Sequence, residues 1–309
     1  MLPKVIHHSD PKKLYEASSY VLAGKGKRFR PQLVLSAADI FDGDRKLALQ
    51  VAAAVEVFHV FTLVHDDIMD KSPERRGRET VHLKWDESTA ILTGDYLLGL
   101  SGQLLLDYPE ATLRGALNRY SDMIRILCEG QVRDMEFESR SDVKLNEYLK
   151  MIDQKTSALL QSSLVLGAMT GEATEDDLSL LDEIGYDLGR AFQIQDDLLD
   201  LVADSPKWGK PVGGDLIAGK KTFLLLQAVQ EESGLAAGFF REIMSSGKMA
   251  PDLLGVAKRK MDDLGVTDFA RSTITLHSDR AQENIARLPA AMGRDALSVL
   301  TDKMRSRLH

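Results

Sequence analysis

The chain has 309 residues, of which 44% are apolar and 28% charged, and this composition provides enough apolar material for a large core. With 47 acidic and 39 basic residues the net charge is -8, which argues against a general nucleic-acid or anionic-membrane binder. The one cysteine, Cys128, excludes an internal disulfide framework and a cysteine-rich zinc module.

Two further features concern the cellular compartment. Residues 1–13 lack the apolar run of a signal peptide. The most apolar stretch, residues 47–64, contains Gln50, Glu56 and His59 and is too polar for a predicted membrane span. We therefore expect a cytoplasmic protein.

Apolar residues recur at three- and four-residue spacing along the chain, which is typical of helices, and no convincing alternating strand pattern is present. In chain order, helices are predicted at residues 31–40, 46–70, 88–106, 110–138, 145–169, 175–202, 220–232, 251–263, 267–288 and 289–307. Irregular segments are expected at 71–85 and 204–219, and a break at 234–247. No linker rich in Gly, Ser or Pro divides these helices. Residues 1–309 are therefore predicted to form one all-α domain, a helical bundle around a deep central cavity, with residues 235–309 bracing it.

The pattern Asp-Asp-x-x-Asp occurs twice, at residues 66–70 and 196–200. Positions i and i+4 share a helix face, so Asp66 points the same way as Asp70, and Asp196 the same way as Asp200. On an exposed face such a like-charge pair costs only about 0.2–0.5 kcal/mol. In a cavity the cost is several kcal/mol per ion unless a cation compensates. We expect both clusters to face one cavity and to bind Mg²⁺, which prefers oxygen ligands and keeps part of its water shell.

Basic segments that contain glycine accompany the two acidic motifs. Residues 72–78 follow the first motif, residues 207–221 follow the second, and residues 24–31 form a third basic segment far upstream. In a Mg²⁺–diphosphate complex the metal bridges carboxylate to phosphate, and Arg or Lys binds the remaining phosphate oxygens. The sequence therefore predicts a diphosphate ligand.

Taken together, these motifs resemble those of the trans-isoprenyl diphosphate synthases (polyprenyl synthetases) across about residues 11–230. They occur in that family's order, as Gly26–Pro31, Glu56–His59, Asp66–Asp70, Arg75–Gly77, Gly94–Asp95, Lys155–Thr156, Phe192–Gln193, Asp196–Asp200, Gly209–Lys210 and Lys220. The resemblance implies condensation of isopentenyl diphosphate with an allylic diphosphate to an all-trans prenyl diphosphate, Mg²⁺ dependence and a homodimer. The sequence departs from the family pattern at Phe29, where Leu is commoner, and at Lys25-Gly26, which replaces a double glycine.

The resemblance also implies roles for individual residues, carried over by position. The diphosphate of isopentenyl diphosphate would be held by Lys27, Arg30, His59 and Arg76. Mg²⁺ on the allylic diphosphate would be bound by Asp66, Asp70, Asp196 and Asp200. The same leaving group would be contacted by Arg75, Lys155, Lys210 and Lys220, and the reacting carbons would lie close to Thr156 and Gln193. The family assigns the lost proton to the released diphosphate, and the sequence singles out no general base.

Three residues before the first acidic motif bear on product length. In the family, a large side chain about one turn before this motif forms the floor of the pocket that holds the growing chain. Phe61 lies five residues before Asp66 and the small Thr62 four, with Phe58 deeper. This pattern resembles geranylgeranyl diphosphate synthases, whereas farnesyl diphosphate synthases, the alternative, often carry two bulky residues there.

Three other classes of protein could use parts of the same sequence pattern. A non-catalytic regulatory subunit of a heteromeric synthase is disfavoured by two complete acidic motifs, and a terpene cyclase by the absence of an Asn/Ser/Glu second motif. A di-metal carboxylate bundle would need repeated Glu-x-x-His, which occurs once, at Glu56–His59. Core packing is expected for His65, His82 and Cys128, and plain surface charge for Lys25, Arg28, Arg78 and Lys221.

Overall fold

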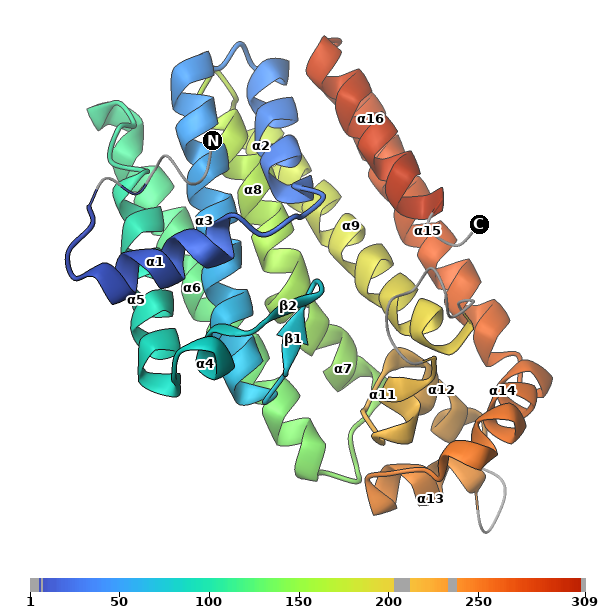
Figure 1. Ribbon diagram of the computed structural model, residues 1–309. Helices are drawn as coiled ribbons and strands as arrows, with labels where there is room; N and C mark the ends of the chain where they lie inside the picture. Colours follow the sequence, from blue (N-terminus) through green and yellow to red (C-terminus); the bar gives the residue numbers. More distant parts are fainter. Residues whose placement is uncertain (1–5, 7, 203–211, 233–237, 307–309) are drawn as a thin grey trace. The chain divides into compact units, whose positions relative to one another are not determined.

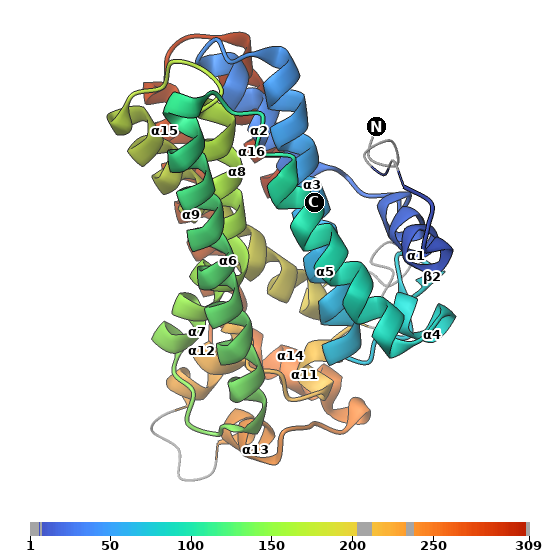
Figure 2. The ribbon, with the colours of Figure 1, turned by 90° about the vertical axis from the view of Figure 1, so that its left-hand side faces the viewer.

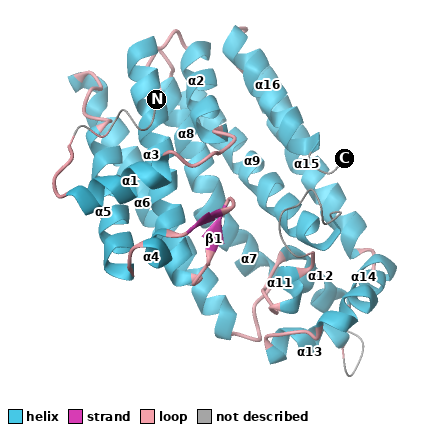
Figure 3. Ribbon diagram, in the orientation of Figure 1, coloured by secondary structure: helices cyan, strands magenta, loops and turns pink. Residues whose placement is uncertain are grey.

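A computed structural model describes residues 6, 8–202, 212–232 and 238–306, which are helical over most of their length (Figures 1 and 3). The chain forms two compact units. Unit 1 comprises Met1–Ser121, Ser163–Leu178 and Pro289–Arg294, and unit 2 comprises Asp122–Ser162, Ser179–Leu288 and Asp295–His309. The prediction of a single domain with one central cavity stays a prediction.

Unit 1 is built on two long helices, α3 (Arg45–Met69) and α5 (Glu87–Gln103), which lie side by side (Figure 2). The other helices that lie wholly in it are α1 (Lys12–Leu22), α2 (Phe29–Ile40) and α4 (Val81–Lys84). Aspartates begin both long helices: Asp44 accepts a hydrogen bond from Leu47 N at 2.7 Å, and Asp86 accepts one from Thr89 N at 2.7 Å.

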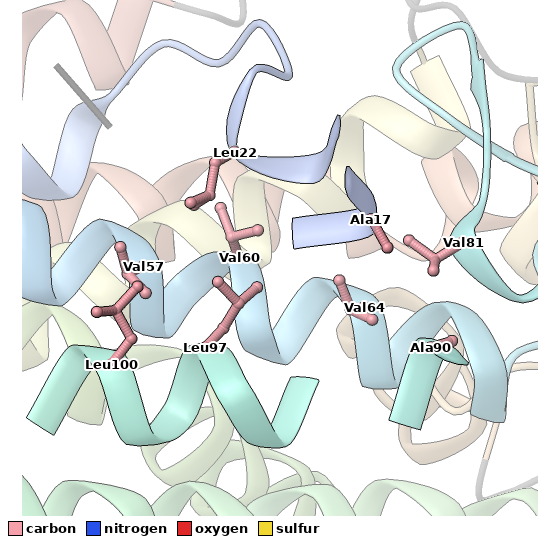
Figure 4. Close-up of a cluster of buried hydrophobic side chains, with 9 residues drawn as sticks. All are labelled: Ala17, Leu22, Val57, Val60, Val64, Val81, Ala90, Leu97 and Leu100. Atoms are coloured by element: carbon pink, nitrogen blue, oxygen red, sulfur yellow. The ribbon is translucent and has the colours of Figure 1, made fainter. Parts of the chain in front are cut away.

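The core of unit 1 comes from helix faces with three- and four-residue spacing. Val57, Val60 and Val64 of α3 form one buried cluster with Leu97 and Leu100 of α5 and with Ala17 and Leu22 of α1 (Figure 4). Full burial of a Val or Leu side chain stabilises the folded chain by about 1.5–3 kcal/mol. This cluster therefore fixes α3, and with it the first acidic motif at the end of that helix.

A small hairpin follows α3, where the sequence predicted irregular structure and no strand. Strands β1 (Glu74–Arg75) and β2 (Arg78–Glu79) pair antiparallel, with Arg75 opposite Arg78. The two residues between them, Arg76 and Gly77, have φ of 57° and 72°, which is a type I′ turn. Strands of two residues are too short to show alternation, so the sequence could not reveal them.

Unit 2 contains most of the C-terminal helices. Its helices are α7 (Leu145–Ile152), the π-helical turn η2 (Asp153–Ser157), α11 (Gly214–Ile217), α12 (Phe223–Glu231), α13 (Phe239–Ser246), the 3-10 turn η3 (Pro251–Leu253), α14 (Leu254–Asp263) and α15 (Val266–Arg287). Four helices have residues in both units: α6 (Glu110–Ser139), α8 (Ala158–Ala168), α9 (Glu175–Val202) and α16 (Met292–Arg305). A buried pair joins α15 to α9, with His277 Nδ1 2.6 Å from Asp187 Oδ1.

The predicted helices occur within a few residues of their expected bounds, and the structure adds the short helices α4 and α11 inside the two segments, 71–85 and 204–219, that were expected to be irregular. Helix α1 was not predicted, and the expected break at 234–247 contains α13. The predicted helix 145–169 is interrupted by the π turn at Asp153–Ser157. A Cβ on Gly130 of α6 would lie 2.5 Å from the backbone nitrogen of Lys155, so that glycine allows α6 to approach the turn closely. This contact depends on tertiary packing, which periodicity does not show.

Within the described residues, α3 is the one helix that is long and apolar enough to span a membrane by length and composition. However, 72% of its most apolar 18-residue stretch is buried in the protein. Core helices pass the same test, and the packing of Figure 4 identifies α3 as a core helix.

Candidate active site

The predicted isopentenyl diphosphate residues form a basic cluster in unit 1. Arg30, in the first turn of α2, lies with Nη1 3.2 Å from His59 Nε2 on α3. Burial lowers the pKa of His59 well below its usual value, and Arg30, Arg76 and Arg75 lower it further. His59 is therefore neutral at neutral pH among permanently charged guanidinium groups, which favours an anionic ligand.

The sequence interpretation of Arg28 as plain surface charge was wrong. Its guanidinium pairs with the buried carboxylate of Glu56 and also donates to the carbonyls of Leu22, at 3.2 Å, and Gly24, at 2.7 Å. Its backbone is left-handed, with φ of 50°. Arg28 thus shapes the segment that carries Lys27, whose side chain is exposed.

The other basic segment meets this one at Gly26. A Cβ at that position would lie 2.6 Å from Nη1 of Arg76, so the hydrogen of glycine leaves room for the guanidinium. Arg76 itself is held in the left-handed region, with φ of 57°. A bulky residue in that conformation stores backbone strain and marks a constrained position.

In the first acidic motif, the middle aspartate differs from its neighbours. Asp67 is buried, and its Oδ1 accepts a hydrogen bond from Arg75 Nε at 2.6 Å. Burial raises the pKa of Asp67, and the positive charge of Arg75 opposes that rise. Asp66 is half-buried and Asp70 exposed. Asp67 therefore holds Arg75, whereas Asp66 and Asp70 share the other face of the helix end.

The second motif repeats this division of roles in unit 2. Asp197 is buried and accepts from Tyr148 Oη at 2.5 Å, from Phe223 N at 2.9 Å and from Gln193 Nε2 at 3.2 Å. Burial raises its pKa to about 7, against the effect of the bonds from Tyr148 and Phe223. Thr156 Oγ1 in turn donates to Gln193 Oε1 at 3.0 Å. The two residues predicted near the reacting carbons, Thr156 and Gln193, are thus brought together and held by Asp197.

Two of the three predicted lysines of the leaving-group site, Lys155 and Lys220, belong to the described part of unit 2. Lys155, in the π turn, donates to Asp134 Oδ2 at 2.6 Å. Lys220 is exposed, with Nζ 3.9 Å from Asp215 Oδ1. Lys210 lies outside the described residues. Its prediction is therefore left as it stands.

Lys221 was also expected to be surface charge, and this was wrong. It is buried and donates to the carbonyl of Glu138, near the C-terminus of α6, at 3.0 Å. A lysine at a helix C-terminus interacts favourably with the helix dipole. Lys221 therefore fixes the backbone next to Lys220.

The metal-binding prediction concerns the outer aspartates of the two motifs. In the part of the chain that the structure describes, no group of three or more His, Cys, Asp or Glu side chains forms a metal site. Mg²⁺ needs only one or two carboxylates when substrate phosphates and water supply the other ligands. The all-oxygen pairs Asp66/Asp70 and Asp196/Asp200 fit such a substrate-completed site. Asp200 also accepts a hydrogen bond from Asp215 N at 3.1 Å, which orients its carboxylate.

The three predicted chain-length residues form layers on α3. Phe58 is fully buried, with its ring centroid 5.7 Å from that of Tyr120. Phe61 is half-buried and covers Phe58 at 5.4 Å. Thr62, also half-buried, donates to the carbonyl of His59 at 2.8 Å. Phe61 is therefore the outer aromatic layer and Phe58 the inner one.

Comparison with known proteins agrees with these observations. A family model described as polyprenyl synthetase matches residues 11–257. The chain belongs to the polyprenyl synthetase family. Its members are metal-dependent prenyl synthases, so the chain is a trans-prenyl diphosphate synthase, a transferase that makes short- to medium-chain products.

Relatives within the polyprenyl synthetase family carry different product names. The geranylgeranyl diphosphate synthase of Sulfolobus acidocaldarius is 45% identical over 225 residues, which cover 72% of this chain and 68% of that protein. The geranylfarnesyl diphosphate synthase of Natronomonas pharaonis is 36% identical, over 94% of this chain and 89% of its own.

Solved structures of polyprenyl synthetases confirm the predicted all-helical fold. The geranylgeranyl pyrophosphate synthetase of Pyrococcus horikoshii matches with a TM-score of 0.91 and 36% identity, covering 99% of this chain and 94% of that one. A polyprenyl synthase of Caulobacter crescentus, complexed with calcium and isoprenyl diphosphate, matches with a TM-score of 0.88 and 28% identity, over 99% and 92% of the two chains.

Sequence reasoning missed the residues that support the site from within. The middle aspartates Asp67 and Asp197 were part of the quoted motifs but received no role. Tyr148, Asp134 and Asp215 carried no sequence signal, because their functions depend on partners far along the chain. The prediction that the two motifs face one cavity stays a prediction, since they lie in different units.

Proposed function

We propose that this polyprenyl synthetase is a Mg²⁺-dependent geranylgeranyl diphosphate synthase, which condenses isopentenyl diphosphate with an allylic diphosphate. The observation that carries the product assignment is the aromatic pair on α3. Phe61 is half-buried over a fully buried Phe58, so the growing chain would meet one bulky layer five residues before Asp66. The relative from Sulfolobus acidocaldarius, named for the same product, supports this choice.

The isopentenyl diphosphate would bind to the basic cluster of unit 1. Arg30, Arg76 and Lys27 supply positive charge, and neutral His59 supplies a ring nitrogen as a hydrogen-bond donor to a phosphate oxygen. Arg30 and His59 are held against each other at 3.2 Å, which keeps part of this site ordered for binding. The nucleophilic double bond is thereby presented in a fixed position.

The allylic diphosphate would be the leaving group of the reaction. Mg²⁺ held by Asp66, Asp70, Asp196 and Asp200 would neutralise the charge that develops on this diphosphate. Arg75, Lys155, Lys210 and Lys220 would bind its remaining oxygens. Asp67 and Asp134 keep Arg75 and Lys155 oriented in the absence of substrate, at 2.6 Å in both pairs.

Thr156 and Gln193 would act at the reacting carbons. When the allylic C–O bond breaks, the oxygens of these side chains can stabilise the carbocation, and Asp197 fixes the amide of Gln193. The double bond of isopentenyl diphosphate then attacks, forming the new C–C bond. The proton lost in the last step passes to the released diphosphate, which is the base that the family resemblance implies.

The homodimer that the family resemblance implies and the cytoplasmic location expected from the sequence remain part of this proposal. Incubating the chain with Mg²⁺, isopentenyl diphosphate and dimethylallyl, geranyl or farnesyl diphosphate in turn, followed by sizing of the products, tests the function. We expect C20 product from each primer, and none when a chelator removes the divalent ion. C15 as the final product would favour the farnesyl alternative. No consumption of isopentenyl diphosphate with any primer would favour the regulatory subunit.

A further inference from the structure

We propose that Tyr20, on α1, is a positioning residue for the isopentenyl diphosphate site, because it anchors strand β2, which follows the turn that contains Arg76. The inference rests on the proposed function, in which Arg76 binds the diphosphate of isopentenyl diphosphate. Tyr20 itself touches no substrate in this account. It acts through the backbone and the side chain of β2.

Tyr20 makes three contacts with the second strand of the hairpin. Its hydroxyl donates to the carbonyl of Glu79 at 2.9 Å, and its own carbonyl accepts from Arg78 Nη1 at 3.0 Å. The Arg78 guanidinium carbon also lies 3.7 Å from the centre of the Tyr20 ring, a cation–π contact. Arg78 is therefore not the plain surface charge that the sequence suggested. The edge of Trp85 packs against the same ring, with centroids 5.3 Å apart.

The hairpin needs such an anchor because it is too short to be stable alone. Isolated two-stranded hairpins are marginal in water, and here each strand has two residues. The turn also holds Arg76 in a left-handed conformation that costs backbone energy. Asp67 fixes the first strand through Arg75. Tyr20 fixes the second, so the turn between the strands is held from both sides.

Helix α1 also leads directly into the other basic segment of the site. At its end, Gly24 N donates to Val21 O at 3.0 Å, and Arg28 Nη2 donates to the carbonyl of Leu22 at 3.2 Å. A cavity of about 60 Å³ is lined by Tyr20, Gly24 and the arginines of the hairpin. One helix thus positions both segments that are proposed to bind the same diphosphate.

The two variants Tyr20→Phe and Tyr20→Ala distinguish the contribution of the hydroxyl to substrate binding from that of the ring. Tyr20→Phe removes the bond to Glu79 and keeps the ring under Arg78, so the KM for isopentenyl diphosphate should rise about threefold. Tyr20→Ala removes both contacts, and the same KM should rise about tenfold or more. The KM for the allylic diphosphate and kcat should stay within twofold. Calorimetry with isopentenyl diphosphate alone, which cannot react, should show the same loss of affinity.

Tyr15 provides a matched control on the same helix. It is half-buried like Tyr20, but its ring packs edge-on against Tyr96 at 5.4 Å, and among the described residues its ring contacts are with Tyr96 and His8 and not with the hairpin. Tyr15→Ala should therefore lower thermal stability without changing either KM. Hydrogen exchange gives a readout that is independent of activity. The amide of Thr80, which bonds to Pro73 O at 3.3 Å, should exchange faster in the Tyr20 variants and at the normal rate in Tyr15→Ala.

The outcomes distinguish this inference from the proposed function. If the unaltered chain turns over isopentenyl diphosphate but the Tyr20 variants keep its KM, or raise both KM values together, the inference is wrong and the function stands. Equal effects of Tyr20→Ala and Tyr15→Ala, or unchanged exchange at Thr80, also overturn it. If the unaltered chain neither binds nor consumes isopentenyl diphosphate, the function and the inference fail together.

Discussion

Replacing Phe61 with alanine should lengthen the product of this enzyme. The Phe61 ring is the half-buried outer layer on α3, and Phe58 lies beneath it with centroids 5.4 Å apart. Removing the outer ring leaves Phe58 as the next floor. Because Phe58 is itself supported by Tyr120, at 5.7 Å, the new floor should be as firm as the old one.

The size of the effect follows from helix geometry. Phe58 precedes Phe61 by three positions on α3. At a rise of about 1.5 Å per residue, this places Phe58 about 4.5 Å deeper along the helix axis. That depth is close to one isoprene unit, so the main product should change from C20 to C25. Because Phe61 is only half-buried, its loss should cost less than the roughly 3–5 kcal/mol typical of a fully buried Phe. Phe58→Ala, at a fully buried position, should cost that full amount.

The assay is mass-spectrometric sizing of products formed from radiolabelled isopentenyl diphosphate and farnesyl diphosphate. Phe269→Ala is a suitable control, since Phe269 is 44% exposed and stacks on Phe223 in unit 2. It should leave the product at C20. If Phe61→Ala also gives only C20 while remaining folded and active, Phe61 does not limit chain length and the layer argument is wrong.

Three further predictions concern residues that support the site. Asp197→Asn keeps the size of the side chain but turns one acceptor into a donor, so kcat should fall at least about tenfold at saturating substrate; kcat near the unaltered value would contradict its positioning role. Below the usual pKa of 6.5 the unfolded chain protonates His59 while the folded chain, whose His59 pKa is lowered, does not. The free energy of unfolding should therefore decrease as pH falls below 6.5, by up to about 1.4 kcal/mol per pH unit. Urea titrations at several pH values should show that this decrease with pH is smaller in His59→Gln than in the unaltered chain. Arg28→Met leaves the buried carboxylate of Glu56 without its partner and should lower the free energy of unfolding by about 3–5 kcal/mol, whereas Lys25→Met, at an exposed position, should change it little in the same measurement.

The sequence allowed most helices to be predicted because their stability depends on a local repeat. Helix α9 begins and ends at the predicted residues, Glu175 and Val202, and the predicted 110–138 helix differs from α6 by one residue. The motif residues were likewise visible because they are adjacent in the chain. In these cases the sequence pattern and the structure it predicts both involve residues that are close together in the chain.

The missed features depend on contacts between distant residues. The π turn at Asp153–Ser157 packs closely against α6 at Gly130, which is far from the turn in the chain. Arg28 was interpreted as surface charge because its partner, Glu56, is 28 residues away. The hairpin is also bonded to Tyr20, which precedes Glu79 by 59 residues. None of these pairings has a spacing that a single sequence can reveal.

The central claim is that the outer aspartates of both motifs hold Mg²⁺ on one allylic diphosphate. A crystal structure with Mg²⁺ and an unreactive thio-analogue of farnesyl diphosphate measures this directly. We predict carboxylate oxygens of Asp66, Asp70, Asp196 and Asp200 at about 2.0–2.1 Å from Mg²⁺ ions that share this diphosphate, with Asp67 and Asp197 remaining on Arg75 and Gln193. Mg²⁺ bound by the middle aspartates, or a diphosphate bound by one motif alone, would contradict the account.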